Sequence, residues 1–581
     1  MTRENRSGAK GRRPWLTRRR ILFLAVFAVA IALRVAYLVQ IQENVSFQII
    51  SLDSDLYDQR ALEILRSDFW GRDVFYSAPL YPYFLALVYA VAGPSFAAVR
   101  VVQIVLGSLT AVLVVLYAER TFGSPVSWIA GFVAALYAPF VFSSATILGT
   151  TLAVFLVTLG LVLFSRTEAE GRRRDALMLL SGVAIGLACL LRPNMVLVLP
   201  LWVVSLAALS RGTRWIRPSI AFLVGGALVV APVTARNAVV GRDFVPISSH
   251  GGVNFWIGNH PGATGTFDLP PGIRGTPEQV NLIDSTRLAT QAAGRNLKPS
   301  EVSAFWFQKG WAYIRENPGE SAGLLVRKVR MFWNRIEIPL NVNFHFLERS
   351  SPFLRIPLMH FGLISPLALL GIGLTLRRWR TLLPAHAVVI ATFAGGVAFF
   401  VSGRYRLPVV PILIVLASYA LWWLVRAARQ RRWGPLAVAG GIGVALAVHA
   451  NVPVEGFDVE RSFARDHYYL AVHYRSQQQL DLALRHYEES LRRNPDFWLS
   501  YNGRGVCLAE IGRLDEAVAS FRKAIDLVPT RAEPWTNLGI ALATHGRVED
   551  AVPCWERALT LDPGDEGART SLERARRLLE P

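Results

Sequence analysis

Long apolar stretches, separated by short polar ones, dominate the first 450 residues of this 581-residue chain. The first apolar run extends from Ile21 to about Ile41. Ten more runs follow, each near the roughly 17–25 residues that a membrane-spanning helix needs: 97–118, 125–142, 151–166, 176–191, 195–210, 218–235, 354–376, 384–401, 408–426 and 434–451. The pattern predicts an all-α, polytopic membrane domain over residues 21–451 with about eleven spans.

Arginine-rich segments alternate with these runs and predict their orientation. The tail of residues 1–20 carries eight Lys or Arg and one acid, and later basic clusters lie at 119–120, 166–174, 211–217, 377–380 and 426–433. If the first helix runs outward, every cluster falls on the cytoplasmic side, as basic loops generally do. We therefore expect a plasma (inner) membrane protein with a cytoplasmic N-terminus, outer loops at about 42–96 and 236–351, and an extracytoplasmic C-terminus. The short apolar segment 78–93 is expected to be interfacial or re-entrant.

The C-terminal part, residues 460–581, contains an internal repeat. Pro495, Pro529 and Pro563 recur every 34 residues. Each follows an alanine and an aromatic residue at matching offsets: Ala483/Tyr487, Ala517/Phe521 and Ala551/Trp555. This is the tetratricopeptide pattern, an α-solenoid of paired helices. It predicts units at 464–495, 498–529 and 532–563, followed by a capping helix, and it favours a peptide or protein partner in the concave groove.

Composition and charge agree with a membrane protein. Hydrophobic residues make up 52% of the chain, mean hydropathy is +0.34, and the net charge is +20. Because the arginines lie between apolar runs, we expect membrane lipids and no nucleic acid as partners. Cys189, Cys507 and Cys554 show no metal-binding spacing, although a Cys507–Cys554 bridge remains open in an oxidising compartment.

Two acids, Asp53 and Asp55, follow the first predicted span in the segment SLDSDLYDQRALEIL. A carboxylate there can act as general base toward an acceptor hydroxyl. A D-x-D pair can also hold a divalent metal through its oxygens. The alternative is that both are solvated acids near a helix start, where they favour the positive end of the helix dipole.

Four arginines are predicted at or near the outer ends of spans: Arg34, Arg192, Arg404 and Arg406. A guanidinium binds phosphate with a fork of donors and stays charged, so their convergence would suit an anionic lipid headgroup. Each alone is also explained by an arginine that reaches toward the headgroups.

A third feature is the Gly-rich segment 245–267. Its residues Asn254, Trp256, Asn259 and His260 can bind a sugar or acceptor, or else pack at the membrane interface.

Taken in order, LDSDLYDQRALEI, SAPLYPYFLALVYAVAG, GVAIGLACLLRPNMVLVLP and GRYRLPVVP resemble the GT-C glycosyltransferases of the protein O-mannosyltransferase and aminoarabinose transferase superfamily, the glycosyltransferase family 39 type. The resemblance covers about residues 20–425. It implies an inverting transferase that uses a polyprenyl-phosphate-linked sugar on the outer face of the membrane. It also implies Asp53 as catalytic base, with Asp55 second, and Arg404, Arg406 and Arg192 near the donor phosphate.

One position departs from that family. Where its members often have a second acid, this chain has Gly149 and Thr150. Asp55 or Glu337 can replace that acid, or the mechanism differs, or activity is lost. The alternatives are therefore an oligosaccharide ligase with a lipid pyrophosphate donor, and a non-catalytic, membrane-tethered repeat scaffold.

Overall fold

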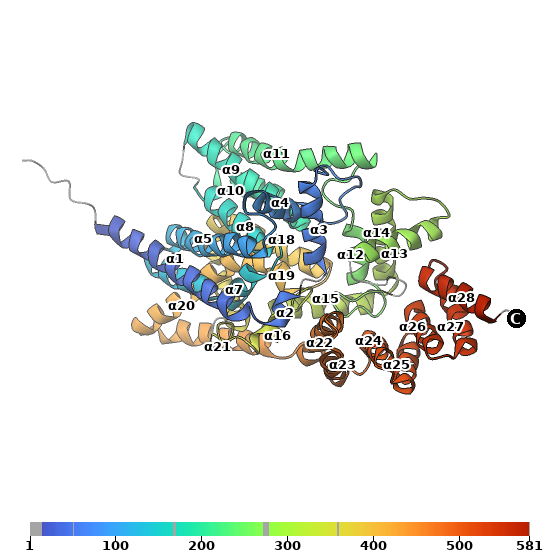
Figure 1. Ribbon diagram of the computed structural model, residues 1–581. Coiled ribbons are helices and arrows are strands. Elements are labelled where there is room, and N and C mark those ends of the chain that lie inside the picture. Colours follow the sequence, from blue (N-terminus) through green and yellow to red (C-terminus); the bar gives the residue numbers. More distant parts are fainter. Residues whose placement is uncertain are drawn as a thin grey trace, which may run out of the picture. The chain divides into compact units, whose positions relative to one another are not determined.

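A computed structural model gives the fold of residues 14–49, 52–166, 170–270, 273, 278–356 and 360–579 (Figure 1). Every regular element among these residues is a helix, and they contain no strand. The expected all-α fold with C-terminal repeats is thus confirmed. Most of the predicted basic tail, residues 1–13, lies outside the described residues, and 14–20 begin the first helix.

The chain divides into two compact units. The first comprises residues 1–41, 50–344 and 348–457, and the second comprises 42–49, 345–347 and 458–581. The second unit therefore consists mainly of the repeat region, together with the short segments 42–49 and 345–347.

Six helical segments of the first unit are long and apolar enough to cross a membrane. They are Arg19–Ile41 within α1 (Pro14–Ile41), α5 (Phe96–Phe122), α11 (Ile216–Gly241), η2 with α18 (Leu376–Arg378 and Trp379–Ala398), α19 to α20 (Gly403–Arg429) and α21 (Trp433–Asn451). A seventh is possible if α6 (Ser124–Leu136) and α7 (Ala138–Ala145), bent by 46° at Tyr137, form one span.

The other predicted spans coincide with shorter or more charged helices. They are α8 (Thr150–Phe164), α9 (Gly171–Cys189), η1 with α10 (Pro193–Leu197 and Val198–Leu209) and α17 (Phe361–Leu374). Each expected apolar run is therefore a helix, but only six or seven meet the length and polarity of a full span. Helix α9 begins with three arginines and an aspartate, so its apolar part is short. The total of eleven remains a prediction.

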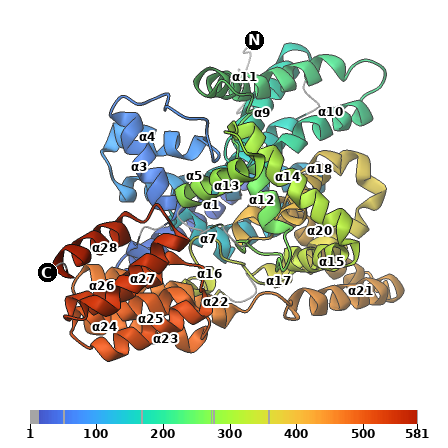
Figure 2. The same ribbon diagram turned by 90° about the vertical axis from the view of Figure 1, so that its right-hand side faces the viewer.

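Small residues bring the helices of this unit close together. A side chain at Gly182 of α9 would overlap the carbonyl oxygen of Phe222, and one at Gly225 of α11 would overlap that of Leu179. Helices α9 and α11 lie side by side in both views (Figures 1 and 2). Close approach through glycine is typical of helix pairs in membranes, where packing replaces the hydrophobic effect as the driving force.

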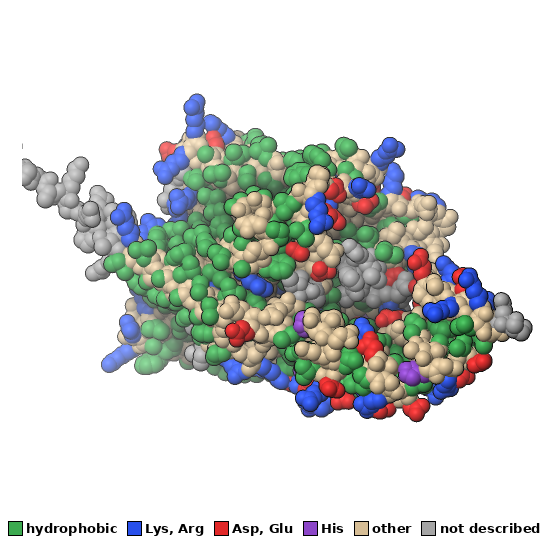
Figure 3. Space-filling model, in the orientation of Figure 1, with side chains coloured by type: hydrophobic (Ala, Val, Ile, Leu, Met, Phe, Trp, Pro, Cys, Tyr) green, Lys and Arg blue, Asp and Glu red, His purple; other side chains and the backbone are tan. Residues whose placement is uncertain are grey.

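Apolar side chains also cover the outside of this unit. Leu24, Val101, Leu180 and Leu228 are more than half exposed, and Figure 3 shows hydrophobic side chains spread over this helical surface. An aqueous surface this apolar is unusual, whereas lipid tails would cover it without cost. The long apolar helices and their exposed apolar side chains together indicate a membrane protein. The short helix α4 (Leu80–Ala92) likewise exposes Leu87 and Val91.

The polar part of the first unit carries its own small helices. They are α3 (Asp53–Leu65), α12 (Gly251–Gly258), α13 (Glu278–Ala293), α14 (Pro299–Glu316) and α15 (Pro318–Trp333), while α16 (Phe344–Glu348) is divided between the two units. Trp256 and Trp306 form part of a separate core between α12 and α14. This core gives the segments near residues 250 and 400 a fixed support.

The second unit is a stack of helix pairs that follows the expected repeat. Its helices are α2 (Val45–Gln48), α22 (Val459–Ser476), α23 (Leu480–Arg493), α24 (Trp498–Glu510), α25 (Leu514–Leu527), α26 (Ala532–Thr544), α27 (Val548–Leu561) and α28 (Glu566–Leu579). Gly505 lies against Phe521, and Gly539 against Trp555, as small and aromatic positions should. The first pair begins at Val459, five residues before the predicted boundary. Cys507 and Cys554 are buried and free, so no bridge joins them.

Candidate active site

Asp53 is the first residue of α3, at the end of the helix that carries partial positive charge. Leu52, immediately before it, has a φ of 58°, a conformation that leucine rarely adopts. Strained backbone of this kind often stands next to functional groups. The Asp53 side chain retains about a fifth of its exposure and is therefore accessible.

Arg404 pairs with Asp53. It lies in the single turn of α19 (Gly403–Arg406), and its Nη2 is 2.8 Å from Asp53 Oδ2. The same nitrogen donates to the hydroxyl of Tyr405 at 3.3 Å. Only 14% of the Arg404 side chain is exposed, so the ion pair is shielded from water and is stronger than a surface pair.

Arg192 joins this pair through the ring of Tyr405. It precedes η1, with its guanidinium 4.7 Å from the ring centroid, while the guanidinium of Arg404 lies 5.1 Å from the same ring. Burial, and after it the neighbouring charge of Arg404, lowers the pKa of Arg192 to about 10. Arg192 remains charged at neutral pH, so two cations share one aromatic ring beside one carboxylate.

These two arginines keep unused donors. The Nε atoms of Arg192 and Arg404 are buried and have no hydrogen-bond partner. Arg192 Nη2 donates to Thr150 Oγ1 at 3.3 Å. Buried donors without partners are rare in proteins and suggest a ligand. An anion with several oxygens, such as a phosphate, would satisfy both.

Arg406 is placed differently. It is buried, its Nη2 lies 2.9 Å from Glu337 Oε1, and its guanidinium sits 3.6 Å from the ring centroid of Phe361. It also donates to the carbonyl oxygens of Phe332 and Asn334 at 2.9 and 2.7 Å. Because it is engaged in this way, the structure does not bring Arg406 to the Asp53 group, although the sequence predicts both for the same phosphate.

Arg34 is also held within the helices. It is 1% exposed, with Nε donating to Ser144 Oγ at 3.2 Å and Nη1 donating to the carbonyl oxygens of Ala30 and Ala135. These bonds fix it between α1, α6 and α7. Its Nη2 is buried without a hydrogen-bond partner among the described residues, but the bonds described join Arg34 to neither Asp53 nor Arg404, so its role at the donor phosphate stays a prediction.

Asp55 does not share a site with Asp53. It is exposed and accepts a hydrogen bond from Gln59 at 2.9 Å. Residues two apart on a helix point in different directions, and Asp53 Oδ2 is already paired with Arg404. The described residues include no group of three or more possible metal ligands. The pair thus does not fit the shared divalent cation that the sequence allowed.

The segment predicted to bind a sugar forms α12 and its C-terminal turn. Trp256, Asn259 and His260 are all buried. Asn259 donates to two carbonyl oxygens and accepts from Lys328 Nζ at 2.9 Å, and both nitrogens of His260 lie against carbonyl oxygens. Their polar atoms therefore support the fold. Asn254, half-buried in α12, has no side-chain hydrogen bond among those given by the structure.

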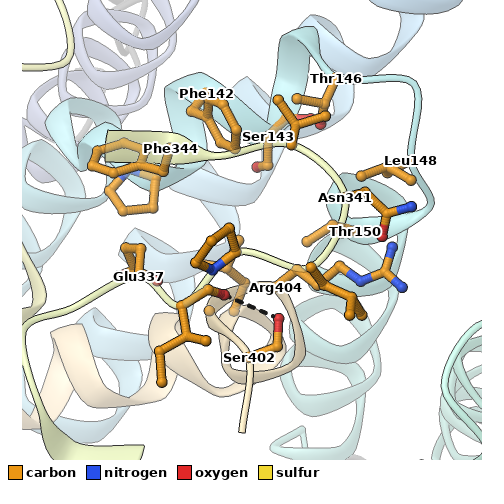
Figure 4. Close-up of a pocket in the computed structure, with 17 residues that line it drawn as sticks. Phe142, Ser143, Thr146, Leu148, Thr150, Glu337, Asn341, Phe344, Ser402 and Arg404 are labelled. Carbon is orange, nitrogen blue, oxygen red and sulfur yellow. Dashed lines mark hydrogen bonds between the residues drawn. The ribbon is translucent and has the colours of Figure 1, made fainter. Parts of the chain in front are cut away.

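A cavity opens beside Arg404 (Figure 4). Its empty volume is about 460 Å³, with solvent at its mouth included. It is lined by α7, the start of α8, the segment 337–344 and the turn 402–407: Pro139, Phe142, Ser143, Thr146, Leu148, Thr150, Glu337, Ile338, Pro339, Leu340, Asn341, Val342, Phe344, Ser402, Gly403, Arg404 and Leu407. Glu337, named from the sequence as a replacement acid, is among them.

His250 is a titratable group that the sequence interpretation did not use. Its Nδ1 lies 2.7 Å from the carbonyl oxygen of Tyr76, which can only accept, so Nδ1 carries a proton. Burial lowers the pKa of His250, and the charges of Asp53 and Arg192 act on it in opposite directions. His250 is therefore a neutral imidazole within electrostatic reach of the site, with Nε2 as an acceptor.

Models of known protein families match two parts of this chain. A family model described as dolichyl-phosphate-mannose-protein mannosyltransferase matches residues 76–236, and two tetratricopeptide-repeat models match residues 468–532 and 532–565. No curated protein matches the chain. The first match includes Arg192 and Thr150 but not Asp53 or Arg404.

Solved structures of low identity also match. The oligosaccharyltransferase of Archaeoglobus fulgidus is 14% identical with a TM-score of 0.44, covering 81% of this chain and 60% of that one. ArnT from Cupriavidus metallidurans, bound to undecaprenyl phosphate, is 16% identical with a TM-score of 0.41, covering 94% and 80%. A tetratricopeptide domain of yeast Sti1, in complex with an Hsp70 peptide, is 20% identical with a TM-score of 0.20, covering 21% and 99%. On the family models, residues 76–236 are similar to the dolichyl-phosphate-mannose-protein mannosyltransferase family, and the C-terminal part of the chain carries tetratricopeptide repeats.

Proposed function

We propose that this protein is an integral-membrane glycosyltransferase that moves a sugar from a polyprenyl-phosphate donor to an acceptor hydroxyl on the extracytoplasmic face. The observation that carries this proposal is the group formed by Asp53, Arg404, Tyr405 and Arg192. It combines one accessible carboxylate with two cations that retain unused donors. The family domain supplies the expected donor class.

The proposed reaction is a single displacement with inversion. Asp53 accepts the proton of the acceptor hydroxyl while that oxygen attacks the anomeric carbon. The bond between the anomeric carbon and the phosphate oxygen breaks, and the lipid phosphate keeps the electron pair. Arg404 and Arg192 stabilise the charge that develops on the leaving phosphate.

Donor binding and base activation are coupled in this proposal. Without donor, Arg404 neutralises Asp53 at 2.8 Å. A bound phosphate would compete for Arg404, and Asp53 would then be free to accept a proton. The base would become available only when the donor is in place, which would limit reaction with water.

The orientation and the role of the repeats belong to the same proposal. The basic loops favour a cytoplasmic N-terminus and an extracytoplasmic repeat unit. In that unit, Asn502 donates to Glu533 at 2.9 Å and Asn537 donates to Asn502 at 3.0 Å, across α24 and α26. These bonds tie the first helices of neighbouring repeats together. Because tetratricopeptide solenoids bind peptides in their concave groove, a polypeptide acceptor or partner is expected there.

The test uses membranes that contain the full chain and radiolabelled polyprenyl-phosphate mannose. We expect transfer of label by the parent chain and by Asp55→Asn, and its loss with Asp53→Asn. Transfer only from a lipid pyrophosphate glycan would instead support the ligase alternative. If Asp53→Asn has full activity in cells while removal of residues 460–581 abolishes the phenotype, the protein is a scaffold and the proposal is wrong.

A further inference from the structure

Asn341 has an acceptor atom that the protein does not use. The residue is 8% exposed, and its Oδ1 is buried without a hydrogen-bond partner. It lines the cavity beside Arg404. Leaving a buried acceptor unpaired is unfavourable, so such atoms in native proteins call for an explanation. A ligand that donates a hydrogen bond inside the cavity provides one.

The backbone around Asn341 is held firmly. Two residues of the 402–404 turn donate to the carbonyl oxygen of Ile338: Gly403 N at 2.9 Å and Ser402 Oγ at 3.2 Å. A side chain at Gly403 would come within 2.5 Å of Glu337 Oε2, so the two segments touch closely. Asn341 and Arg404 thus belong to two segments whose spacing is fixed. In Figure 4 their polar ends extend to the same side of the cavity, away from Phe142 and Phe344.

Other polar groups of the lining are already engaged. Ser143 Oγ donates to Phe140 O, Thr146 Oγ1 donates to Ser143 O, and Thr150 Oγ1 accepts from Arg192. Glu337 is paired with Arg406 at 2.9 Å. The lining therefore offers a ligand mainly apolar walls, the neutral acceptor of Asn341 and the charged edge of Arg404.

We propose that this cavity holds the sugar of the donor and that Asn341 Oδ1 accepts a hydrogen bond from one of its hydroxyls. The inference rests on the proposed function and names the sugar class. A pyranose ring has apolar faces and a rim of hydroxyls, and its phosphate at Arg404 places it next to Asn341.

The charge of the cavity selects among sugars. The Glu337 carboxylate is neutralised by Arg406, so no free carboxylate awaits an ammonium group on the sugar. Arg404 is needed by the phosphate, so no free cation awaits a sugar carboxylate. The substrate class is therefore an uncharged hexose or pentose, in preference to an amino sugar or a uronic acid.

The test measures transfer by the purified full chain in nanodiscs, with synthetic polyprenyl-phosphate mannose and its monodeoxy analogues. Asn341→Leu keeps the number and branching of the side-chain heavy atoms and removes the acceptor. We expect it to reduce kcat/KM for the parent sugar about ten-fold. We also expect this penalty to disappear for the one analogue that lacks the contacted hydroxyl.

Stability provides a second readout. Asn341 Oδ1 has no partner to lose, so Asn341→Leu should leave the melting temperature unchanged or raised. Asn343→Leu is the control: Asn343 is also buried and does have an interaction partner, so its variant should melt at a lower temperature.

Three outcomes would overturn the inference, and they separate it from the proposed function. An equal loss for every analogue, or no loss for any, excludes Asn341 as the sugar contact while the transferase function stands. A higher kcat/KM for an amino-sugar or uronic-acid donor than for the mannose donor excludes the neutral sugar class. If the parent chain neither binds nor transfers any sugar from polyprenyl phosphate, the proposed function fails and this inference fails with it.

Discussion

Asp53 and Arg404 are 351 positions apart in the sequence, and their side chains meet with 2.8 Å between Oδ2 and Nη2. One stands at the first residue of α3 and the other in the turn before α20. The pair connects the polar segment that follows α1 with the turn that precedes the last two apolar helices, α20 and α21. It marks the position at which the donor phosphate and the acceptor hydroxyl would meet.

Replacing Asp53 with Asn should reduce glycosyl transfer about 10²- to 10⁴-fold, the range typical of a lost general base. Asp55→Asn should retain activity within about two-fold, because Asp55 is exposed and contacts only Gln59 among the bonds described. Initial rates at saturating donor measure both. Equal losses for the two variants would exclude a distinct role for Asp53.

The pair of Arg406 and Glu337 should be structural. Glu337→Gln removes the charge that compensates a buried guanidinium, and we expect it to lower the free energy of unfolding by about 3 kcal/mol. Glu63→Gln, in the exposed pair with Arg60, should change it by less than about 1 kcal/mol. Denaturant titrations in detergent compare them. A Glu337→Gln protein as stable as the parent would argue that the pair contributes nothing.

Gly403 should not tolerate a side chain. An alanine Cβ would lie 2.5 Å from Glu337 Oε2 and 3.2 Å from Glu337 Cα, so the turn that carries Arg404 must shift. We expect Gly403→Ala to destabilise the protein by about 1–3 kcal/mol and to reduce activity. Gly440→Ala in α21 meets no atom within 4 Å and should stabilise its helix by about 0.5–1 kcal/mol. Thermal melts and transfer rates distinguish the two.

Lys328 should make stability depend on pH. Burial lowers the pKa of Lys328 to about 7, from a usual value near 10.5, and the unfolded chain therefore binds its proton more tightly between these values. The destabilisation caused by burying the charged Lys328 amine is fully present below pH 7 and is lost as pH rises toward 10.5. Lys328→Met should raise the melting temperature more at pH 6.5 than at pH 9.5.

The exposed Lys298 supplies the control for that measurement. Lys298→Met should leave the slope of melting temperature against pH as it is in the parent chain. If Lys328→Met shifts the melting temperature equally at both pH values, the titration of Lys328 does not contribute to the pH dependence of stability.

The sequence predicted which residue types could act in the site. It did not predict which of those residues contact one another in the folded chain. Apolar runs and 34-residue repeats are local patterns, and each became a helix or a helix pair. Asp53 and two arginines were named, and the structure brings these three together. Arg406 was named with them because it is two residues from Arg404. Its contacts with Glu337, 69 positions earlier, and with the carbonyl oxygens of Phe332 and Asn334 separate their roles.

The loop at 245–267 shows the same limit from another side. Its glycines suggested turns around a ligand, but residues 251–258 form a helix, and Gly252 is required by the close approach of the backbone at Ser303. Asn341 lies in LNVNF, a segment with no motif. Its Oδ1 is unpaired because no donor among the described residues lies beside it, and a local sequence pattern cannot show this.

The ring of Tyr405 between two guanidinium groups bears on how the reaction would end. With Asp53 paired, the group holds two positive charges and one negative. A phosphodiester donor carries one negative charge, whereas the phosphate monoester left after transfer carries about 1.5 to 2 at neutral pH. On the proposed function, the spent lipid carrier would bind more tightly than the donor, and return of Asp53 to Arg404 would help to expel it. Carrier release, rather than bond breaking, would then limit the turnover rate.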